Sequence, residues 1–104
     1  MGTSKPRMTS ATVSVLRELL ADPTKTRYGY ELMKRTGLPS GTLYPILARL
    51  ERAGWLESFF EDIDPEEGRP PRRHYRLTRD GLDQARLDQV RGRRVRRLVR
   101  APAR

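Results

Sequence analysis

Hydrophobic residues recur every three or four positions in the first part of the chain, which predicts an amphipathic helix. Thr9 or Ser10 can cap its start, because a side-chain oxygen there accepts a hydrogen bond from a free backbone amide. Asp22-Pro23 ends it. The positions expected on its buried face are Val13, Leu16, Leu19 and Leu20.

A second, shorter helix is predicted from about Tyr28 to Thr36, after the polar stretch 24–27. Leu32 and Met33 are expected to face inward. Gly37 follows, and glycine is favoured just past a helix end. The first half of the chain therefore predicts a helix, a loop and a helix.

A third amphipathic pattern follows the tight turn Leu38-Pro-Ser-Gly-Thr-Leu43. Its apolar residues are spaced i, i+3, i+4 and i+7, at Leu43, Ile46, Leu47 and Leu50. Proline has no N–H and is tolerated only in the first turn of a helix. Pro45 therefore indicates that the regular helix either starts near Thr42 or is bent at the proline.

Two strand-like runs come next. The aromatic-rich run Trp55–Phe60 predicts one strand, and the alternating run Arg72–Leu77 predicts another. Residues 61–71 between them are acidic and then rich in Gly and Pro, which predicts a hairpin with a mobile tip. Thr78 can then cap a last helix with sparse apolar positions, at Leu82, Ala85, Leu87 and Val90.

The order of three helices, two strands and a helix is that of a winged helix-turn-helix with an added C-terminal helix, an α+β fold that is mostly α. We expect residues 8–78 to form the winged-helix domain and residues 79–98 a C-terminal helix that serves in dimerisation. Residues 1–7 and 99–104 are expected to be flexible basic termini.

The composition favours one small intracellular domain. With 104 residues, 36% hydrophobic and 34% charged, the chain can bury a single small core that an oligomer interface could extend. The absence of cysteine removes disulfides and thiolate metal sites. No apolar run approaches the roughly 20 residues that span a bilayer, and the start lacks the apolar stretch of a secretory signal. The expected location is the cytoplasm, without membrane contact.

The positive charge is concentrated at one end. Lys and Arg outnumber Asp and Glu 22 to 13, a net charge of +9 that attracts polyanions such as nucleic acid or anionic lipid. Residues 91–104 contain seven Arg and no acid, so the remainder carries 15 basic against 13 acidic residues, or only +2. A solvated or nonspecific arm and a specific reader explain this basic tail equally well.

The third helix has a polar side suited to nucleic acid. In a helix-turn-helix this element enters the major groove, and its hydroxyls and guanidinium can contact phosphates or base edges. The residues off the apolar stripe are Ser40, Thr42, Tyr44, Ala48 and Arg49. An ordinary solvated helix face is the alternative, and periodicity alone favours it. Tyr44 precedes a proline, which could aim its ring into a groove rather than into the core.

The hairpin between Phe60 and Tyr75 is the candidate wing. Its basic residues Arg69, Arg72 and Arg73 lie where such a loop would straddle a phosphate backbone or reach into a minor groove. The loop also holds five acids, at Glu61, Asp62, Asp64, Glu66 and Glu67. DNA would repel a tip of that charge unless the acids point away, so we expect the arginines after Gly68 to make the contacts.

Five segments, taken in order, closely resemble PadR-like transcriptional regulators. They are Tyr28-Gly-Tyr-Glu-Leu32, Ser40-Gly-Thr-Leu-Tyr-Pro45, Leu47-Ala-Arg-Leu-Glu51, Ala53-Gly-Trp-Leu-Glu57 and Gly68-Arg-Pro-Pro-Arg-Arg-His-Tyr-Arg-Leu-Thr78. The resemblance spans roughly residues 12–82. It implies a winged-helix homodimer that binds a palindrome-like operator in double-stranded DNA, usually as a repressor relieved by a signal. A small-molecule effector of unknown identity belongs to that expectation.

The resemblance also implies roles for particular residues. The segment 40–45 would enter the groove, Arg69 and Arg72 would belong to the wing, and the start of the second helix could hold a backbone phosphate through free N–H groups. The residues expected to contact DNA are Tyr28, Gly29, Ser40, Gly41, Thr42, Tyr44, Pro45, Arg49, Arg69, Arg72 and Arg73.

The dimer would have to be built differently from that of longer family members, which carry a substantial C-terminal helical domain. Only residues 83–104 follow Leu82 here. We therefore expect the first and last helices to share the interface, although an intramolecular core explains the same apolar positions equally well. The candidate interface residues are Val13, Leu16, Leu20, Leu82, Leu87 and Val90.

No residue set in the sequence suits catalysis, so an enzyme is not expected, nor is a metal or a cofactor. The one histidine, His74, lies in a predicted strand, and the carboxylates cluster in a flexible loop. The alternative to DNA binding is a winged-helix module for protein interaction or RNA binding, because a fold alone does not fix function. Such a protein-binding module would depend on apolar surface such as Phe59 or Phe60 rather than on Tyr44 and Arg72.

Overall fold

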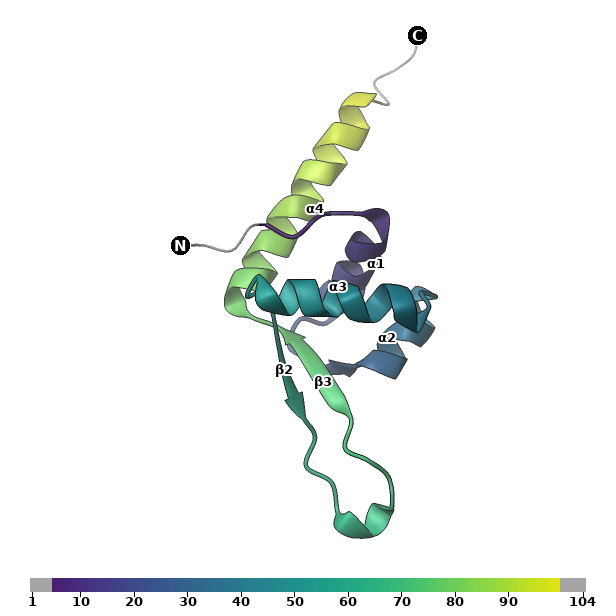
Figure 1. Ribbon diagram of the computed structural model, residues 1–104. Helices are drawn as coiled ribbons and strands as arrows, with labels where there is room; N and C mark the ends of the chain where they lie inside the picture. The colour runs from purple at the N-terminus through teal and green to yellow at the C-terminus, as the bar shows by residue number, and fades with distance from the viewer. Residues whose placement is uncertain (1–4, 100–104) are drawn as a thin grey trace.

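The computed structural model describes residues 5–99, with the side chains of residues 5–89, as four helices around a small antiparallel sheet (Figure 1). The elements are α1 (Ser10–Ala21), β1 (Arg27–Tyr28), α2 (Gly29–Thr36), α3 (Ser40–Arg52), β2 (Leu56–Phe60), the short 3-10 turn η1 (Pro65–Glu67), β3 (Arg73–Leu77) and α4 (Arg79–Val99). This mostly helical arrangement confirms the predicted fold class.

The predicted helix boundaries rest on capping contacts that the structure contains. Thr9 precedes α1, and its Oγ1 accepts a hydrogen bond from the Thr12 amide at 3.1 Å. Gly37 ends α2 with a φ of 76°. At the start of α4, Thr78 Oγ1 accepts a hydrogen bond from the Gly81 amide at 2.9 Å. Local cap chemistry therefore sets three helix ends, as the sequence predicts.

The structure decides one open alternative and corrects two local predictions. Of the two alternatives that Pro45 leaves open, a start near Thr42 is excluded, because α3 starts at Ser40. Pro45 therefore lies in the second turn and leaves the Gly41 carbonyl without an amide partner from residue 45. Val15 is fully buried, whereas Val13 is only half-buried, so the inner face of α1 is turned from the predicted one. Tyr28 belongs to the two-residue strand β1, which the sequence analysis missed, and α2 begins after it.

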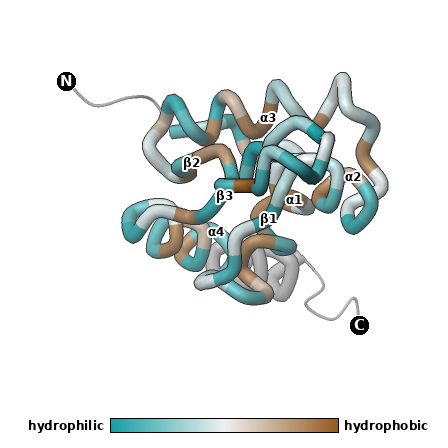
Figure 2. The backbone as a smooth tube through the Cα atoms, turned by 90° about the horizontal axis from the view of Figure 1, so that it is seen from below, coloured by the Kyte–Doolittle hydropathy of each residue, from teal (hydrophilic) through white to brown (hydrophobic). Residues whose placement is uncertain are grey.

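The core is formed by one face of each helix and the inner residues of the sheet. Leu43, Ile46, Leu47 and Leu50 of α3 are all buried, as their spacing predicts. Figure 2 shows the same alternation as hydrophobic stretches that recur between hydrophilic ones along α3 and α4. Because all the helices pack on one apolar centre, α3 is held rigidly with its other face outward.

The sheet positions the wing, by which we mean β2, β3 and the loop 61–72 between them. The strand order is β1-β3-β2, all antiparallel, with Ser58 opposite Tyr75 and Phe59 opposite His74. Figure 1 shows the wing leaving the helical body at one end, while α4 extends from the other. The wing is therefore anchored to the body at its base and carries its tip far from the core.

Candidate nucleic-acid interface

The outward face of α3 presents the residues predicted for its groove-entering side, except Ala48, which is half-buried. Tyr44 is 43% exposed, and Arg49 makes no ion pair within the part of the chain that the structure describes. The exposed residues of the predicted set on this helix are Ser40, Gly41, Thr42, Tyr44, Pro45 and Arg49. The face thus offers hydroxyls, backbone and the Arg49 guanidinium, groups that can donate hydrogen bonds to phosphates or base edges.

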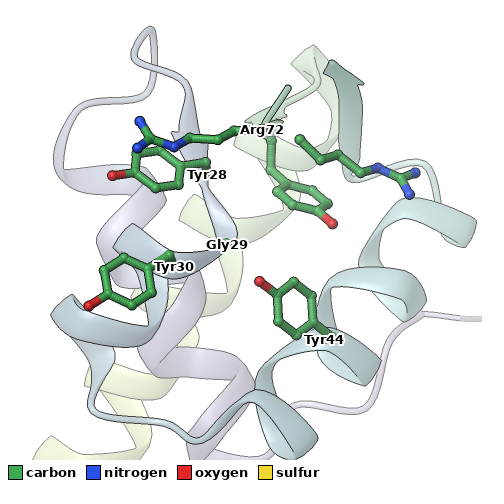
Figure 3. Close-up of a pocket in the computed structure, with 7 residues that line it drawn as sticks. Tyr28, Gly29, Tyr30, Tyr44 and Arg72 are labelled. Carbon is green, nitrogen blue, oxygen red and sulfur yellow. The ribbon is translucent and has the colours of Figure 1, made fainter. Parts of the chain in front are cut away.

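Tyr44 reaches from α3 to the start of α2. A side-chain carbon built on Gly29 would lie 2.7 Å from the Tyr44 ring, well inside contact distance, so a larger residue at position 29 would force the ring to move. Figure 3 shows Tyr44 pointing from α3 toward Gly29. Two residues predicted as DNA contacts are therefore packed against each other.

A cavity of about 250 Å³ opens beside this contact, between α3, the start of α2 and the base of the wing (Figure 3). The Arg72 guanidinium carbon lies 4.6 Å from the centre of the Tyr28 ring, a cation–π arrangement. Arg72 is exposed and has no ion-pair partner among the described residues. The cavity is lined by Tyr28, Gly29, Tyr30, Tyr44, Arg72, Arg73 and Tyr75.

A second hollow, of about 560 Å³, shares Tyr44, Arg73 and Tyr75 with the first. It continues along α3 past Ala48 and Arg52. All four tyrosines of the chain line these two hollows. Burial raises the pKa of the Tyr75 phenol above its usual 10.0, so this hydroxyl stays protonated at neutral pH. The two hollows form one aromatic surface between α3 and the wing.

The wing loop is closed by Glu61. Its carboxylate forms an ion pair with Arg69, and its Oε2 lies 2.9 Å from Nε2 of His74. Oε1 of Glu61 also accepts a hydrogen bond from the Arg72 amide at 3.2 Å. The hydrogen bond with His74, followed by that with Arg69, lowers the pKa of Glu61 from 4.5 to about 2. Glu61 is therefore an anion at neutral pH and holds both sides of the loop.

Two arginines of the wing are paired with acids. Arg69 is paired with Glu61 and, through Nε, with Glu67 at 3.3 Å. Arg73 is paired with Glu51 of α3 at 3.2 Å. The structure thus separates the three arginines predicted to contact DNA from the wing, because Arg69 and Arg73 are paired with acids, whereas Arg72 has no ion-pair partner among the described residues.

The apolar residues predicted for a dimer interface have different surroundings. Leu16 is only 3% exposed and belongs to the core of a single chain, whereas Leu87 is 44% exposed. Val13, Leu20 and Leu82 are half-buried. The side chain of Val90 and those of the basic tail 91–104 lie outside the described residues.

Four residues that line the hollows were missed by the sequence analysis, namely Tyr30, Glu51, Arg52 and Tyr75, and so was Ser58, which hydrogen-bonds to Glu51 and Arg73 beside them. Tyr75 alternates with Arg73 along β3, and this signal could have placed the two on one face. Glu51 and Ser58 gave no such signal, because single polar residues in amphipathic elements are expected to be solvated.

The described residues contain no group of three or more His, Cys, Asp or Glu side chains arranged to hold a metal ion. Among the helices of this part of the chain, none is both long and apolar enough to cross a membrane.

Comparison with known proteins places these features in a family. The model of the transcriptional regulator PadR-like family matches residues 18–87. The PcaV transcriptional regulator from Streptomyces coelicolor superposes with a TM-score of 0.74 at 33% identity, over 92% of this chain and 65% of that one. The structure of PcaV with its natural ligand gives 0.71 at 33% identity, over 93% and 64%. This chain thus spans slightly less than two thirds of the PcaV chain.

A PadR family transcription regulator from Clostridium difficile has the same fold, with a TM-score of 0.71 at 24% identity over 86% of this chain and 95% of that one. No curated protein matches the chain.

Proposed function

This chain belongs to the PadR-like family of transcriptional regulators, and from that premise we propose that it is a homodimeric repressor of a palindromic operator. The family is one of DNA-binding regulators and not of enzymes. In the proposed complex, α3 enters the major groove, and the wing lies at the backbone or in the minor groove.

One observation carries the proposal. Three surfaces that can contact DNA meet around the two tyrosine-lined hollows. The exposed face of α3, the start of α2 and the unpaired Arg72 all border them. The cap residue Tyr28 makes no side-chain hydrogen bond to the first turn of α2, so the amides there are available to a phosphate. We therefore propose Tyr28, Gly29, Tyr44 and Arg72 as backbone contacts and the exposed residues of α3 as groove contacts.

Variants at two positions separate DNA binding from the alternative of a protein-interaction module. Tyr44→Ala and Arg72→Ala should each weaken binding to the operator by about tenfold, equivalent to about 1.4 kcal/mol. Arg76→Ala is a matched control, because Arg76 is already paired with Glu57 on the other face of the wing. If Tyr44→Ala and Arg72→Ala bind like the wild type while Phe60→Ala loses a protein partner, the interaction module is the better description.

The proposed dimer would use α1 and α4. Leu87 on α4 is exposed and Leu82 is half-buried, as are Val13 and Leu20 on α1, so these residues can lose further apolar surface to water in a dimer. Leu16 is already buried within one chain, so it would support the dimer interface from beneath without losing much further surface to it. Light scattering should report a dimer at micromolar concentration, and a monomer there would contradict this arrangement.

Two further parts of the proposal concern control and the tail. PcaV was crystallised with its natural ligand. We propose that this protein too binds a small molecule, and that the binding relieves repression. Residues 91–104 are proposed to act as a nonspecific arm. Their deletion should reduce the slope of the logarithm of the binding constant against the logarithm of salt concentration by ~0.9 for each phosphate that they neutralise. The preference for the operator sequence should remain. Loss of preference would instead indicate a reader or a dimer element.

The experiment that tests the function is selection of genomic fragments with the purified protein, followed by footprinting near physiological salt with competitor DNA. A protected palindrome with half-sites about 34 Å apart would support a dimeric, specific regulator. Weak retention of all sequences that disappears with added salt would contradict it.

A further inference from the structure

Three polar side chains from three different elements form a closed ring at the junction of α3 and the wing. Arg73 of β3 donates from Nη2 to both carboxylate oxygens of Glu51 in α3, at 3.2 and 3.3 Å. Nε and Nη2 of the same guanidinium donate to Ser58 Oγ in β2, at 3.0 and 2.8 Å. Ser58 in turn donates to Glu51 Oε2 at 2.6 Å. We call Glu51, Ser58 and Arg73 the brace.

The hydrogen-bonding capacity of the serine is fully used in this ring. A hydroxyl has one proton to donate and two lone pairs to accept with, and Ser58 donates to Glu51 and accepts two N–H groups from Arg73. The guanidinium also lies over the rings of Phe60 and Tyr75, at 5.9 and 5.8 Å. Arg73 is therefore held by groups from α3, β2 and β3 at once.

The brace lies beside the short connection between α3 and the wing, where a change in their relative angle would occur. Only residues 53–55 separate the end of α3 from the start of β2. Above this short connection, the brace ties the last turn of α3 to the middle of β2 and the start of β3. The groove-entering helix and the wing contact one duplex at the same time. If the angle between them is already fixed in the free protein, binding does not incur the entropic cost of restricting it.

The neighbouring arginines 72 and 73 are not equivalent in this respect. Arg72 has no ion-pair partner among the described residues and lies on the Tyr28 ring, open to a phosphate. Arg73 already has a carboxylate, so a phosphate would have to compete with Glu51 for it. The sequence alone predicts the same role for both.

We propose that Glu51, Ser58 and Arg73 are positioning residues that set the angle of the wing to α3, and so determine the preference for the operator over other DNA. Arg73 acts within the protein and is not a DNA contact. This inference rests on the proposed DNA-binding function.

The first test compares Glu51→Gln with Glu57→Gln, using the selected operator duplex and a scrambled duplex of the same length. Both variants remove one negative charge, and Glu57 pairs with Arg76 across the wing without touching α3. Electrostatics alone would tighten binding to both duplexes equally. The brace predicts that Glu51→Gln lowers the ratio of operator affinity to scrambled-duplex affinity by roughly threefold to tenfold, and that Glu57→Gln leaves this ratio unchanged.

The second test removes the charge question. Ser58→Ala breaks the ring without changing any charge, and it should lower the same ratio. Arg73→Ala should also lower this affinity ratio, but it should leave unchanged the slope of the logarithm of the binding constant against the logarithm of salt concentration. Arg72→Ala should reduce this salt slope by ~0.9, the value for one phosphate that is no longer neutralised. Thermal unfolding of each variant identifies any that fails to fold, and Ser58→Ala is the mildest change.

The third test measures the wing angle without DNA. The chain contains no cysteine, so two introduced cysteines are the only sites that a spin label can modify. We place them at Arg49→Cys on α3 and at Asp62→Cys, just after β2. Dilution of the labelled protein with unlabelled protein suppresses distances between subunits. The distance distribution should broaden in Glu51→Gln and Ser58→Ala, and keep its width in Glu57→Gln.

The outcomes separate the inference from the function on which it rests. A wild-type protein with no preference for any duplex overturns both. A wild-type preference that Glu51→Gln and Ser58→Ala retain, or a salt slope that Arg73→Ala reduces by ~0.9, overturns the brace alone.

Discussion

The helical body and the wing differ in the kind of contact that holds them. In the body, Leu32, Leu43 and Leu50 have no exposed surface, and stability comes from apolar area removed from water. In the wing loop, Glu61 links the two sides through charged hydrogen bonds to Arg69, His74 and the Arg72 amide. Each region should therefore resist changes that disturb the other, and this contrast can be tested from both sides.

The largest effect is expected from a cavity in the body. Leu47 is 1% exposed, so Leu47→Ala should lower the free energy of unfolding by about 2–5 kcal/mol, measured by urea denaturation. Phe60 in the wing is 66% exposed, and Phe60→Ala should change it by less than about 1 kcal/mol. Equal losses would mean that the wing also has an apolar core.

A smaller and local effect is expected from the charge in the wing. Glu61→Gln keeps the size of the side chain but removes the anion that Arg69 and His74 face. Amide hydrogen exchange of Arg72 should accelerate, while exchange in α3 stays the same. Glu66→Gln is the matched control, because Glu66 is exposed at the tip. Acceleration in both variants would show that Glu61 has no special role.

Low pH should destabilise the wing by protonating the Glu61 carboxylate. The pKa of Glu61 is lowered from 4.5 to about 2, so its ionised form stabilises the fold fully above pH 4.5, and this stabilisation disappears as the pH falls through about 2. The carboxyl resonance of Glu61 in NMR should therefore titrate near pH 2. A midpoint near 4.5 would contradict the contacts with His74 and Arg69.

Salt should produce the smallest difference. At 1 M salt the Debye length is about 3 Å, so charged contacts at the wing surface are weakened while apolar burial is not. Exchange of the Arg72 amide should accelerate in 1 M sodium chloride, and exchange in α3 should not. In Glu61→Gln this salt effect should be reduced, and an undiminished effect would point to other charges.

The parts of the fold that local chemistry decides could be predicted from the sequence. The leucine spacing of α3, the Thr9 and Thr78 caps and Gly37 each act within a few residues, so a one-dimensional pattern contains them. The two-residue β1 could not be predicted, because its residues pair with residues of β3 that lie 46 and 48 positions further along the chain. The sequence left two alternatives open at Pro45, and the earlier start at Ser40 could not be chosen from it, because packing of Leu43 and its neighbours outweighs the missing hydrogen bond at Pro45.

The candidate interface was predicted as a set of residues, but not as an arrangement. Exposure of Ser40, Thr42 and Arg49 follows from their place off the apolar stripe. The different surroundings of Arg72 and Arg73 do not, since the partner of Arg73 lies 22 residues away on another element. An ion pair between exposed residues has no periodicity to reveal it.

The contact between Gly29 and Tyr44 makes the two positions depend on each other. In a library in which both codons are randomised, alanine or serine at position 29 should survive selection for operator binding only beside a smaller residue at position 44. A large ring at position 44 should in turn return glycine at position 29. The order of change should therefore be one-sided, with a larger residue at position 29 accepted only after, or together with, a smaller residue at position 44.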